Sequence, residues 1–88
     1  MTEHVLKCWP EYFAELDKGT KQFELRRDDR GFKVGDRLML REWEPATQQY
    51  SGRELLLRIT YKLEHRPGAG CAAEFGLKEG YAILSVAR

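Results

Sequence analysis

Alternation of apolar and polar residues from Arg53 to Glu64, interrupted only by Leu56, is the feature that most limits how this chain folds. The apolar side chains at every second position are Leu55, Leu57, Ile59, Tyr61 and Leu63. Because successive side chains of a strand point to opposite faces, this period predicts one long strand with one face in a core. A chain of 88 residues builds only one modest core, so residues 1–88 are expected to form a single domain around this strand.

Shorter segments supply partners for this strand. The other expected strands are His4–Cys8, Gln22–Arg26, Arg37–Glu44 and Tyr81–Ala87. One helix is expected from Pro10 to Lys18, with Gly19 as its C-terminal cap and an apolar side formed by Tyr12, Phe13 and Leu16. Residues 45–52 are expected to form a hairpin loop, and residues 65–80 a loop with one helical turn at 72–75.

This order of elements predicts an α+β, mainly β architecture. With so few residues, a small β-barrel of about five to six strands with one amphipathic helix packed on it hides the sheet edges best. No apolar run approaches the ~20 residues that cross a bilayer, and no leader precedes the first strand. The chain is therefore expected to be a cytoplasmic, soluble monomer with no membrane partner.

Charge and cysteine content narrow the function classes. Fifteen Lys and Arg residues against fourteen Asp and Glu give a net charge of +1, which argues against a long groove that follows many phosphates. A small nucleotide pocket stays compatible with that charge. Cys8 and Cys71 are too few for a secreted disulfide framework and are expected to be reduced and structural. His4 and His65 have no metal-ligand spacing, so neither a metal nor a cofactor is expected.

The polar residues that carry chemistry are Lys21, Glu24 and Arg26. On an extended segment Glu24 and Arg26 project from the same face, while Phe23 and Leu25 are expected to anchor the opposite face in the core. A carboxylate between two cations offers a fork and a compact charge for a phosphate or base edge, and an acceptor for an exocyclic amine. The alternative interpretation is an ion-pair network that only fixes the junction between helix and barrel.

The stretch Gly19-Thr20-Lys21-Gln22-Phe23-Glu24-Leu25-Arg26 matches the pattern GxKxxExR. On this motif the chain resembles the ASCH domains of the PUA-like superfamily. Four further blocks resemble an uncharacterised bacterial and phage ASCH-like subfamily, at residues 6–13, 32–36, 50–53 and 76–81. The resemblance implies a PUA-like β-barrel with a cleft between barrel and helix, lined by the signature residues. It also implies one of three activities, since relatives bind RNA, cleave it, or hydrolyse the amide of N4-acetylcytidine.

The amidohydrolase branch uses a lysine, a threonine and a glutamate, and this chain departs from that pattern. Lys21 matches the lysine, but Glu24 stands where the threonine is expected, and a carboxylate would form an anhydride rather than an ester with an acetyl group. The spacing of Thr20 does not establish that it faces the cleft. Glu74 and Glu79 are the nearest candidates for the glutamate, without a matching motif.

Aromatic residues give a second set of candidates. Trp9, Trp43, Tyr50 and Tyr61 are available as stacking faces for a base. Core packing is the simpler interpretation for Phe13, Phe23 and Tyr61. Trp9 precedes Pro10 at the helix entrance, where a hydrophobic staple and a place on the cleft explain it equally well.

These observations predict an RNA- or nucleotide-binding domain that recognises a nucleobase or single-stranded RNA through Lys21, Glu24, Arg26 and Trp9. The first alternative is a small hydrolase of an acylated nucleoside, or a ribonuclease, with Lys21 and Glu24 as catalytic residues. The second is a protein-interaction module that uses the hairpin at residues 50–53 and the glycine-rich loop at residues 65–80.

Overall fold

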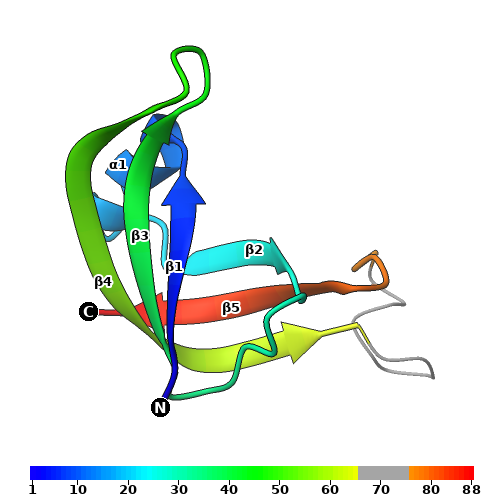
Figure 1. Ribbon diagram of the computed structural model, residues 1–88. Coiled ribbons are helices and arrows are strands. Elements are labelled where there is room, and N and C mark those ends of the chain that lie inside the picture. The colour runs from blue at the N-terminus through cyan, green and yellow to red at the C-terminus, as the bar shows by residue number, and fades with distance from the viewer. Residues whose placement is uncertain (66–75) are drawn as a thin grey trace.

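The structure is a computed structural model that describes residues 1–65 and 76–88. Its elements follow one another along the chain as β1 (Glu3–Cys8), α1 (Pro10–Lys18), β2 (Phe23–Arg27), β3 (Arg37–Glu44), β4 (Gln49–Glu64) and β5 (Tyr81–Ala87) (Figure 1). The helical turn expected at residues 72–75, together with Cys71 and Glu74, lies outside the described residues. No helix in the described part of the chain is long and apolar enough to cross a bilayer.

All five of these strands belong to one curled sheet in the order β1-β3-β4-β5-β2. β1 runs parallel to β3, and the remaining neighbours are antiparallel. The long β4 pairs with β3 through its first part and with β5 through its second, so the sheet bends along it (Figure 1). The mainly β architecture with one helix is thereby confirmed, as a half-barrel whose two edge strands are β1 and β2.

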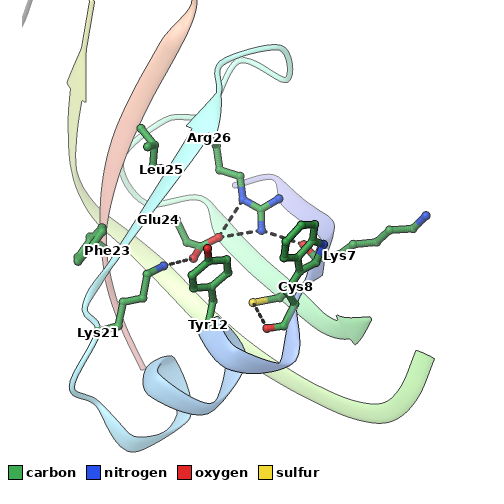
Figure 2. A pocket seen from close by; sticks show the side chains of 9 residues that line it. Lys7, Cys8, Tyr12, Lys21, Phe23, Glu24, Leu25 and Arg26 are labelled. Atoms are coloured by element: carbon green, nitrogen blue, oxygen red, sulfur yellow. Dashed lines mark hydrogen bonds and ion pairs between the residues drawn. The ribbon is translucent and has the colours of Figure 1, made fainter. Parts of the chain in front are cut away.

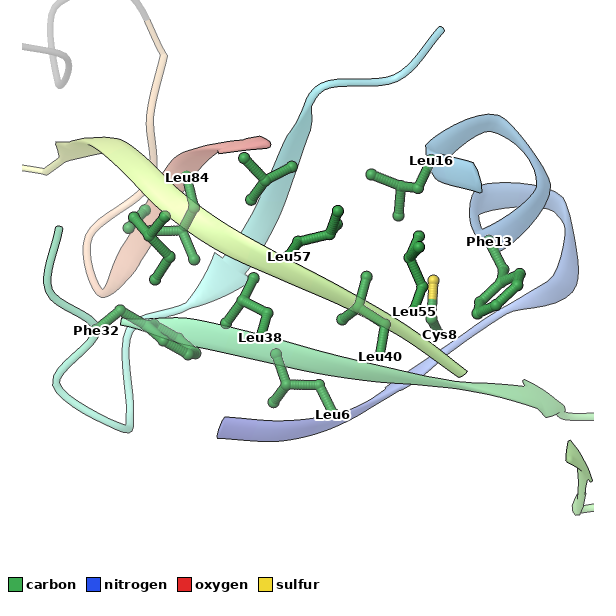
Figure 3. Close-up of a cluster of buried hydrophobic side chains, with 13 residues drawn as sticks. Leu6, Cys8, Phe13, Leu16, Phe32, Leu38, Leu40, Leu55, Leu57 and Leu84 are labelled. Atoms are coloured by element: carbon green, nitrogen blue, oxygen red, sulfur yellow. The ribbon is translucent and has the colours of Figure 1, made fainter. Parts of the chain in front are cut away.

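The core fills the concave side of this sheet and the space beneath α1 (Figure 3). Its largest fully buried side chains are Phe13, Phe32, Leu38, Leu40, Ile59 and Leu84. Most of the core side chains that come from the sheet belong to β3 and β4, because every second side chain of each strand points inward. The helix adds only Phe13 and Leu16.

The helix begins and ends where the sequence predicts. Pro10 occupies the first turn, where its missing N–H costs nothing, and Gly19 ends the helix with a φ of 85°. Tyr12 was expected on the apolar side with Phe13 and Leu16, and this expectation is wrong, since Tyr12 is half exposed. Tyr12 lies about 100° around the helix from Phe13, at the border of the buried face, and its side chain is next to β1 and β2.

A β-bulge changes the direction of the side chains in the second half of β4. Ile59 pairs with Val86 and Tyr61 with Ser85, so that two residues of β4 oppose one step of β5. Beyond the bulge Lys62 takes the inward position beside Leu84. The expected core position of Tyr61 is therefore wrong, because this side chain is 59% exposed. β4 also begins at Gln49 rather than Arg53, which shortens the hairpin loop to residues 45–48.

Strand β2 shows the opposite orientation to the one expected. Phe23 and Leu25 are 47% and 56% exposed, whereas Glu24 is buried. The pairing with β5 explains this orientation, because Glu24 lies opposite Leu84, an inward-facing residue with no exposed surface. The core anchoring predicted for Phe23 and Leu25 is wrong, and the polar face of β2 points inward.

Candidate functional site

The two edge strands β1 and β2 are joined by arginine side chains rather than by strand pairing in the described residues. Arg26 on β2 donates from Nη2 to the carbonyl oxygen of Lys7 at 2.9 Å. Arg30, in the segment after β2, donates from Nη1 to the carbonyl oxygen of Val5 at 3.0 Å. Both carbonyls belong to the outer edge of β1, so these arginines satisfy acceptors that an edge strand otherwise leaves to solvent.

Beside this junction Glu24 holds two cations. Lys21 Nζ lies 2.8 Å from Oε1 of Glu24, and Arg26 places Nε and Nη2 each 2.8 Å from Oε2. Only 5% of the Glu24 side chain is exposed, against 18% for Lys21 and 24% for Arg26. A buried carboxylate is tolerated when it is paired and hydrogen-bonded, which explains how the polar face of β2 turns inward. We refer to these three residues as the ion cluster.

A pocket of about 530 Å³ opens directly beside the ion cluster (Figure 2). This size falls within the ~300–1,000 Å³ typical of small-ligand sites. Strand β1 and the helix start contribute one wall and β2 the other, and the lining residues are Lys7, Cys8, Trp9, Tyr12, Lys21, Phe23, Glu24, Leu25 and Arg26. The pocket therefore combines a charged floor with walls that are mostly apolar and aromatic.

Two aromatic rings form the wall on the helix side. Trp9 and Tyr12, three residues apart, lie with ring centres 6.3 Å apart and planes inclined by only 16°. Both side chains are about half exposed. Lys21 connects this wall with β2, since its Nζ lies 5.3 Å from the Tyr12 ring centre and 4.8 Å from that of Phe23. A flat ligand thus meets aromatic surface at the entrance and charge at the floor.

Cys8 is the one thiol in the described residues and it lines this pocket from below. Burial, assisted by the nearby negative charge of Glu24, raises the pKa of Cys8 to about 11. The thiol is protonated at neutral pH and lacks the thiolate that nucleophilic catalysis requires. Cys8 therefore acts as a packing residue, as its sequence context predicts.

The four residues that the sequence analysis names for binding, Lys21, Glu24, Arg26 and Trp9, all line this single pocket. Sequence reasoning missed the other five lining residues, of which three were assigned to the core: Tyr12, Phe23 and Leu25, besides Lys7 and Cys8. A signal for the inward turn of β2 existed in the sequence. Glu24 is flanked by a cation on each side at short spacing, the pairing that a buried carboxylate requires.

The remaining catalytic candidates lie elsewhere. The Thr20 hydroxyl is exposed and sits 2.6 Å from Oε1 of Glu15, so it faces the helix end rather than the pocket. Glu79 is exposed in the turn before β5 and does not line the pocket. In the part of the chain that the structure describes, no group of three or more acidic, cysteine or histidine side chains is arranged to hold a metal ion.

Fold and site together define the class: a small, mainly β domain in which a half-barrel and one helix enclose a cationic, aromatic-walled pocket. The family model described as "Domain of unknown function (DUF3850)" matches residues 3–86, and the chain belongs to this family. It is also 37% identical over 57 residues to a protein of Escherichia phage P2, the "Uncharacterized 12.9 kDa protein in GpA 3'region". That match covers 65% of this chain and 50% of the phage protein, so the chain spans about half the length of this relative.

Proposed function

We propose that this chain is an ASCH-type, PUA-like domain that binds RNA or a nucleotide, with one nucleotide held in the pocket beside the ion cluster. The observation that carries the proposal is a buried carboxylate between two cations at the floor of an aromatic-walled pocket. In support of the family assignment, Lys21, Glu24 and Arg26 of the GxKxxExR motif lie together between helix and sheet.

The hydrogen-bonding capacity of the ion cluster favours a ligand rich in acceptors. Arg26 donates from Nε and Nη2 to Glu24, and from Nη2 also to the Lys7 carbonyl. Both N–H groups of Nη1 therefore have no partner among the described residues. Lys21 has three N–H donors, and Glu24 accepts one. Two cations against one carboxylate also leave the floor with one net positive charge. Base carbonyls, ring nitrogens and phosphate oxygens all meet that requirement.

The walls favour a planar ring. Trp9 and Tyr12 expose about half of their surface, and Phe23 and Leu25 face them across the pocket. Stacking of a base on an aromatic side chain contributes about 1–3 kcal/mol and tolerates any base. A ring with acceptors at its edge, joined to a phosphate, combines both features, and this combination describes a nucleotide.

The proposal is tested by calorimetric titration with the four ribonucleoside 5'-monophosphates. Lys21→Ala is expected to weaken the binding by tenfold or more, because a charge-assisted hydrogen bond contributes roughly 1.5–3 kcal/mol. Lys18→Ala is the matched control: Lys18 pairs with Glu15 at the same i,i+3 spacing, but on the exposed helix end. Equal affinities of the two variants, or no saturable binding by the unaltered chain, would contradict the proposal.

An activity assay on the unaltered chain and its variants distinguishes a nucleotide-binding domain from an amidohydrolase. Incubation with N4-acetylcytidine is expected to release no cytidine, because three donors hold the Glu24 oxygens and no threonine hydroxyl lines the pocket from the described residues. Cytidine release that is lost in Lys21→Ala and in Glu24→Gln would instead establish the amidohydrolase alternative.

A further inference from the structure

The convex face of β1, β3 and β4 carries more cations than carboxylates. Four cations project from it, Lys7, Arg37, Arg41 and Arg58, against the two carboxylates of Glu3 and Glu54. The chain as a whole is almost neutral, so this excess is a local property of the face. We call it the outer face.

Two of the arginines on this face lie opposite each other, with one carboxylate beside them, since Glu3 is the neighbour of Arg37 across β1 and β3. Arg37 and Arg58 are directly paired across β3 and β4, and both side chains are exposed. Among the described residues, neither forms an ion pair with a carboxylate within 4.0 Å. Like charges at directly opposed positions destabilise a sheet, and the single carboxylate of Glu3 offsets only one of the two arginines, so a bound anion would stabilise this pair.

Aromatic residues lie at the hairpin end of the same face. The ring centres of Trp43 and Tyr50 are 4.7 Å apart in an edge-to-face arrangement. Lys7 Nζ lies 4.0 Å from the Trp43 ring centre, and the guanidinium carbon of Arg41 lies 3.9 Å from that of Tyr50. Glu54 pairs with Arg41 at 3.3 Å, which leaves Lys7 as the cation of this group without a carboxylate partner among the described residues.

Lys7 connects the outer face with the pocket. It is one of the residues that line the pocket, and its side chain points away from Glu24 (Figure 2). Its Nζ lies over the Trp43 ring on the outer face. A polymeric ligand that extends from the pocket over the edge of β1 therefore contacts a cation and two aromatic rings directly. Interleaved cations and aromatic rings are the surface on which single-stranded nucleic acids bind.

We propose that the outer face binds the single-stranded RNA that continues from the nucleotide in the pocket, so that the ligand is an RNA strand rather than a free nucleotide. The inference rests on the proposed function. Phosphates are expected at Lys7 and at the Arg37–Arg58 pair. Bases are expected over Trp43 and Tyr50, and the apolar row of Val5, Met39 and Leu56, which are neighbours across three strands, lies between these two groups.

The experiment compares an RNA strand with a mononucleotide on the same variants. A fluorescent single-stranded RNA of about ten nucleotides, within the range that one small β domain covers, is titrated at several salt concentrations. The test variant is Arg37→Gln with Arg58→Gln, which removes a repulsive pair and is not expected to unfold the chain. The control is Arg27→Gln with Lys78→Gln, which removes the same charge near Tyr81 and outside the outer face.

The strand is expected to bind at least tenfold more tightly than any ribonucleoside 5'-monophosphate. The test variant is expected to lose that gain and to reduce the slope of log K against log salt by about 1.4, since each phosphate contact on a single strand contributes about 0.7. Its affinity for mononucleotides is expected to be unchanged, and the control variant is expected to behave like the unaltered chain.

Three results would overturn this inference: a strand that binds no more tightly than a mononucleotide, test and control variants with equal affinity for the strand, or no binding of either ligand. The last result would overturn the proposed function as well. Strand binding that depends on Arg37 and Arg58, without any mononucleotide binding, would support the outer face and contradict the pocket. Capture of a protein in place of RNA, lost in the test variant, would also count against the inference.

Discussion

Two of the buried carboxylates, Glu24 and Asp36, have different surroundings. Glu24 lies between Lys21 and Arg26, two flexible side chains whose heads are partly exposed beside a pocket. Asp36 lies at the start of β3, where Oδ2 is 2.9 Å from Nε2 of His4. The backbone N–H groups of Thr2 and Lys33 also donate to it, at 3.2 and 3.1 Å.

The two sites differ in whether their hydrogen-bond donors still have N–H groups available for a ligand. A backbone N–H donates once, so Thr2 and Lys33 have nothing more to give after binding Asp36. The imidazole of His4 is buried and packs edge-to-face on Phe32, 4.7 Å between ring centres. Lys21 and Arg26 retain donors beside an open volume. A buried carboxylate held by rigid donors thus serves the fold, and one held by flexible cations at a pocket is equipped for a ligand.

The largest expected effect is a loss of stability when Asp36 is replaced. Asp36→Ala leaves two backbone N–H groups and a buried imidazole without their acceptor and is expected to lower the free energy of unfolding by about 3 kcal/mol. Urea denaturation measures this loss. Nucleotide affinity, measured where the variant is fully folded, is expected to stay the same. A loss of affinity without a loss of stability would reverse the roles of the two sites.

Arg26→Ala is the corresponding substitution at the ion cluster beside the pocket. This substitution removes the donors to Glu24 and to the Lys7 carbonyl, and also the N–H groups of Nη1 that are available to a ligand. Nucleotide affinity is therefore expected to fall by about tenfold to a hundredfold. The stability loss is expected to be smaller than for Asp36→Ala, because Lys21 still pairs with Glu24 and the freed carboxylate oxygen borders the pocket, where water can reach it. Calorimetric titration and urea denaturation on the same sample give both numbers. A larger stability loss than that of Asp36→Ala, with unchanged affinity, would make the ion cluster a structural element.

Trp9→Ala tests the aromatic wall. Loss of one base stack is expected to weaken nucleotide binding by about tenfold. The matched control is Tyr61→Ala, which removes an exposed aromatic ring that does not line the pocket. Neither variant is expected to change stability much, since both rings are about half exposed or more. Equal binding by the two variants would assign Trp9 to the helix entrance alone.

The smallest expected effect is the pH dependence that Asp36 gives to the stability of the fold. The hydrogen bond from His4, helped by the backbone donors, holds the pKa of Asp36 below its ordinary value. Its contribution to stability is therefore fully present above the unfolded carboxyl pKa of about 3.9 and is lost as the pH falls through the lower folded value. Asp36→Asn is expected to flatten the fall of the unfolding free energy below pH 4. An unchanged acid profile, recorded by urea denaturation from pH 7 down to about pH 3, would show that Asp36 does not drive it.

Local signals in the sequence were sufficient for most of the fold. Pro10 and Gly19 fix the ends of α1, and alternation places Leu38, Leu40, Leu55 and Leu57 in the core. The orientation of β2 was not predicted, because alternation identifies two faces without saying which is inward. Hydrophobicity assigned the inward face to Phe23 and Leu25, whereas pairing with β5 and charge neutralisation by Lys21 and Arg26 decide for Glu24.

The site could be predicted as a group of residues but not as a pocket. The short spacing from Lys21 to Arg26 already places three charges together. The aromatic wall depends on long-range packing, since Trp9 and Tyr12 reach the pocket only because the fold brings the start of α1 beside β2. The exposure of Tyr61 depends likewise on a bulge opposite β5 that no local pattern announces.

Chemical-shift mapping of the backbone amides during titration with a ribonucleoside 5'-monophosphate compares both carboxylate sites in a single experiment. We predict saturable shifts at Trp9, Tyr12 and Lys21–Arg26, with the amides of Thr2, Lys33 and Asp36 unchanged. Saturable shifts confined to the surroundings of Asp36, or a spectrum that the nucleotide leaves unchanged throughout, would contradict it.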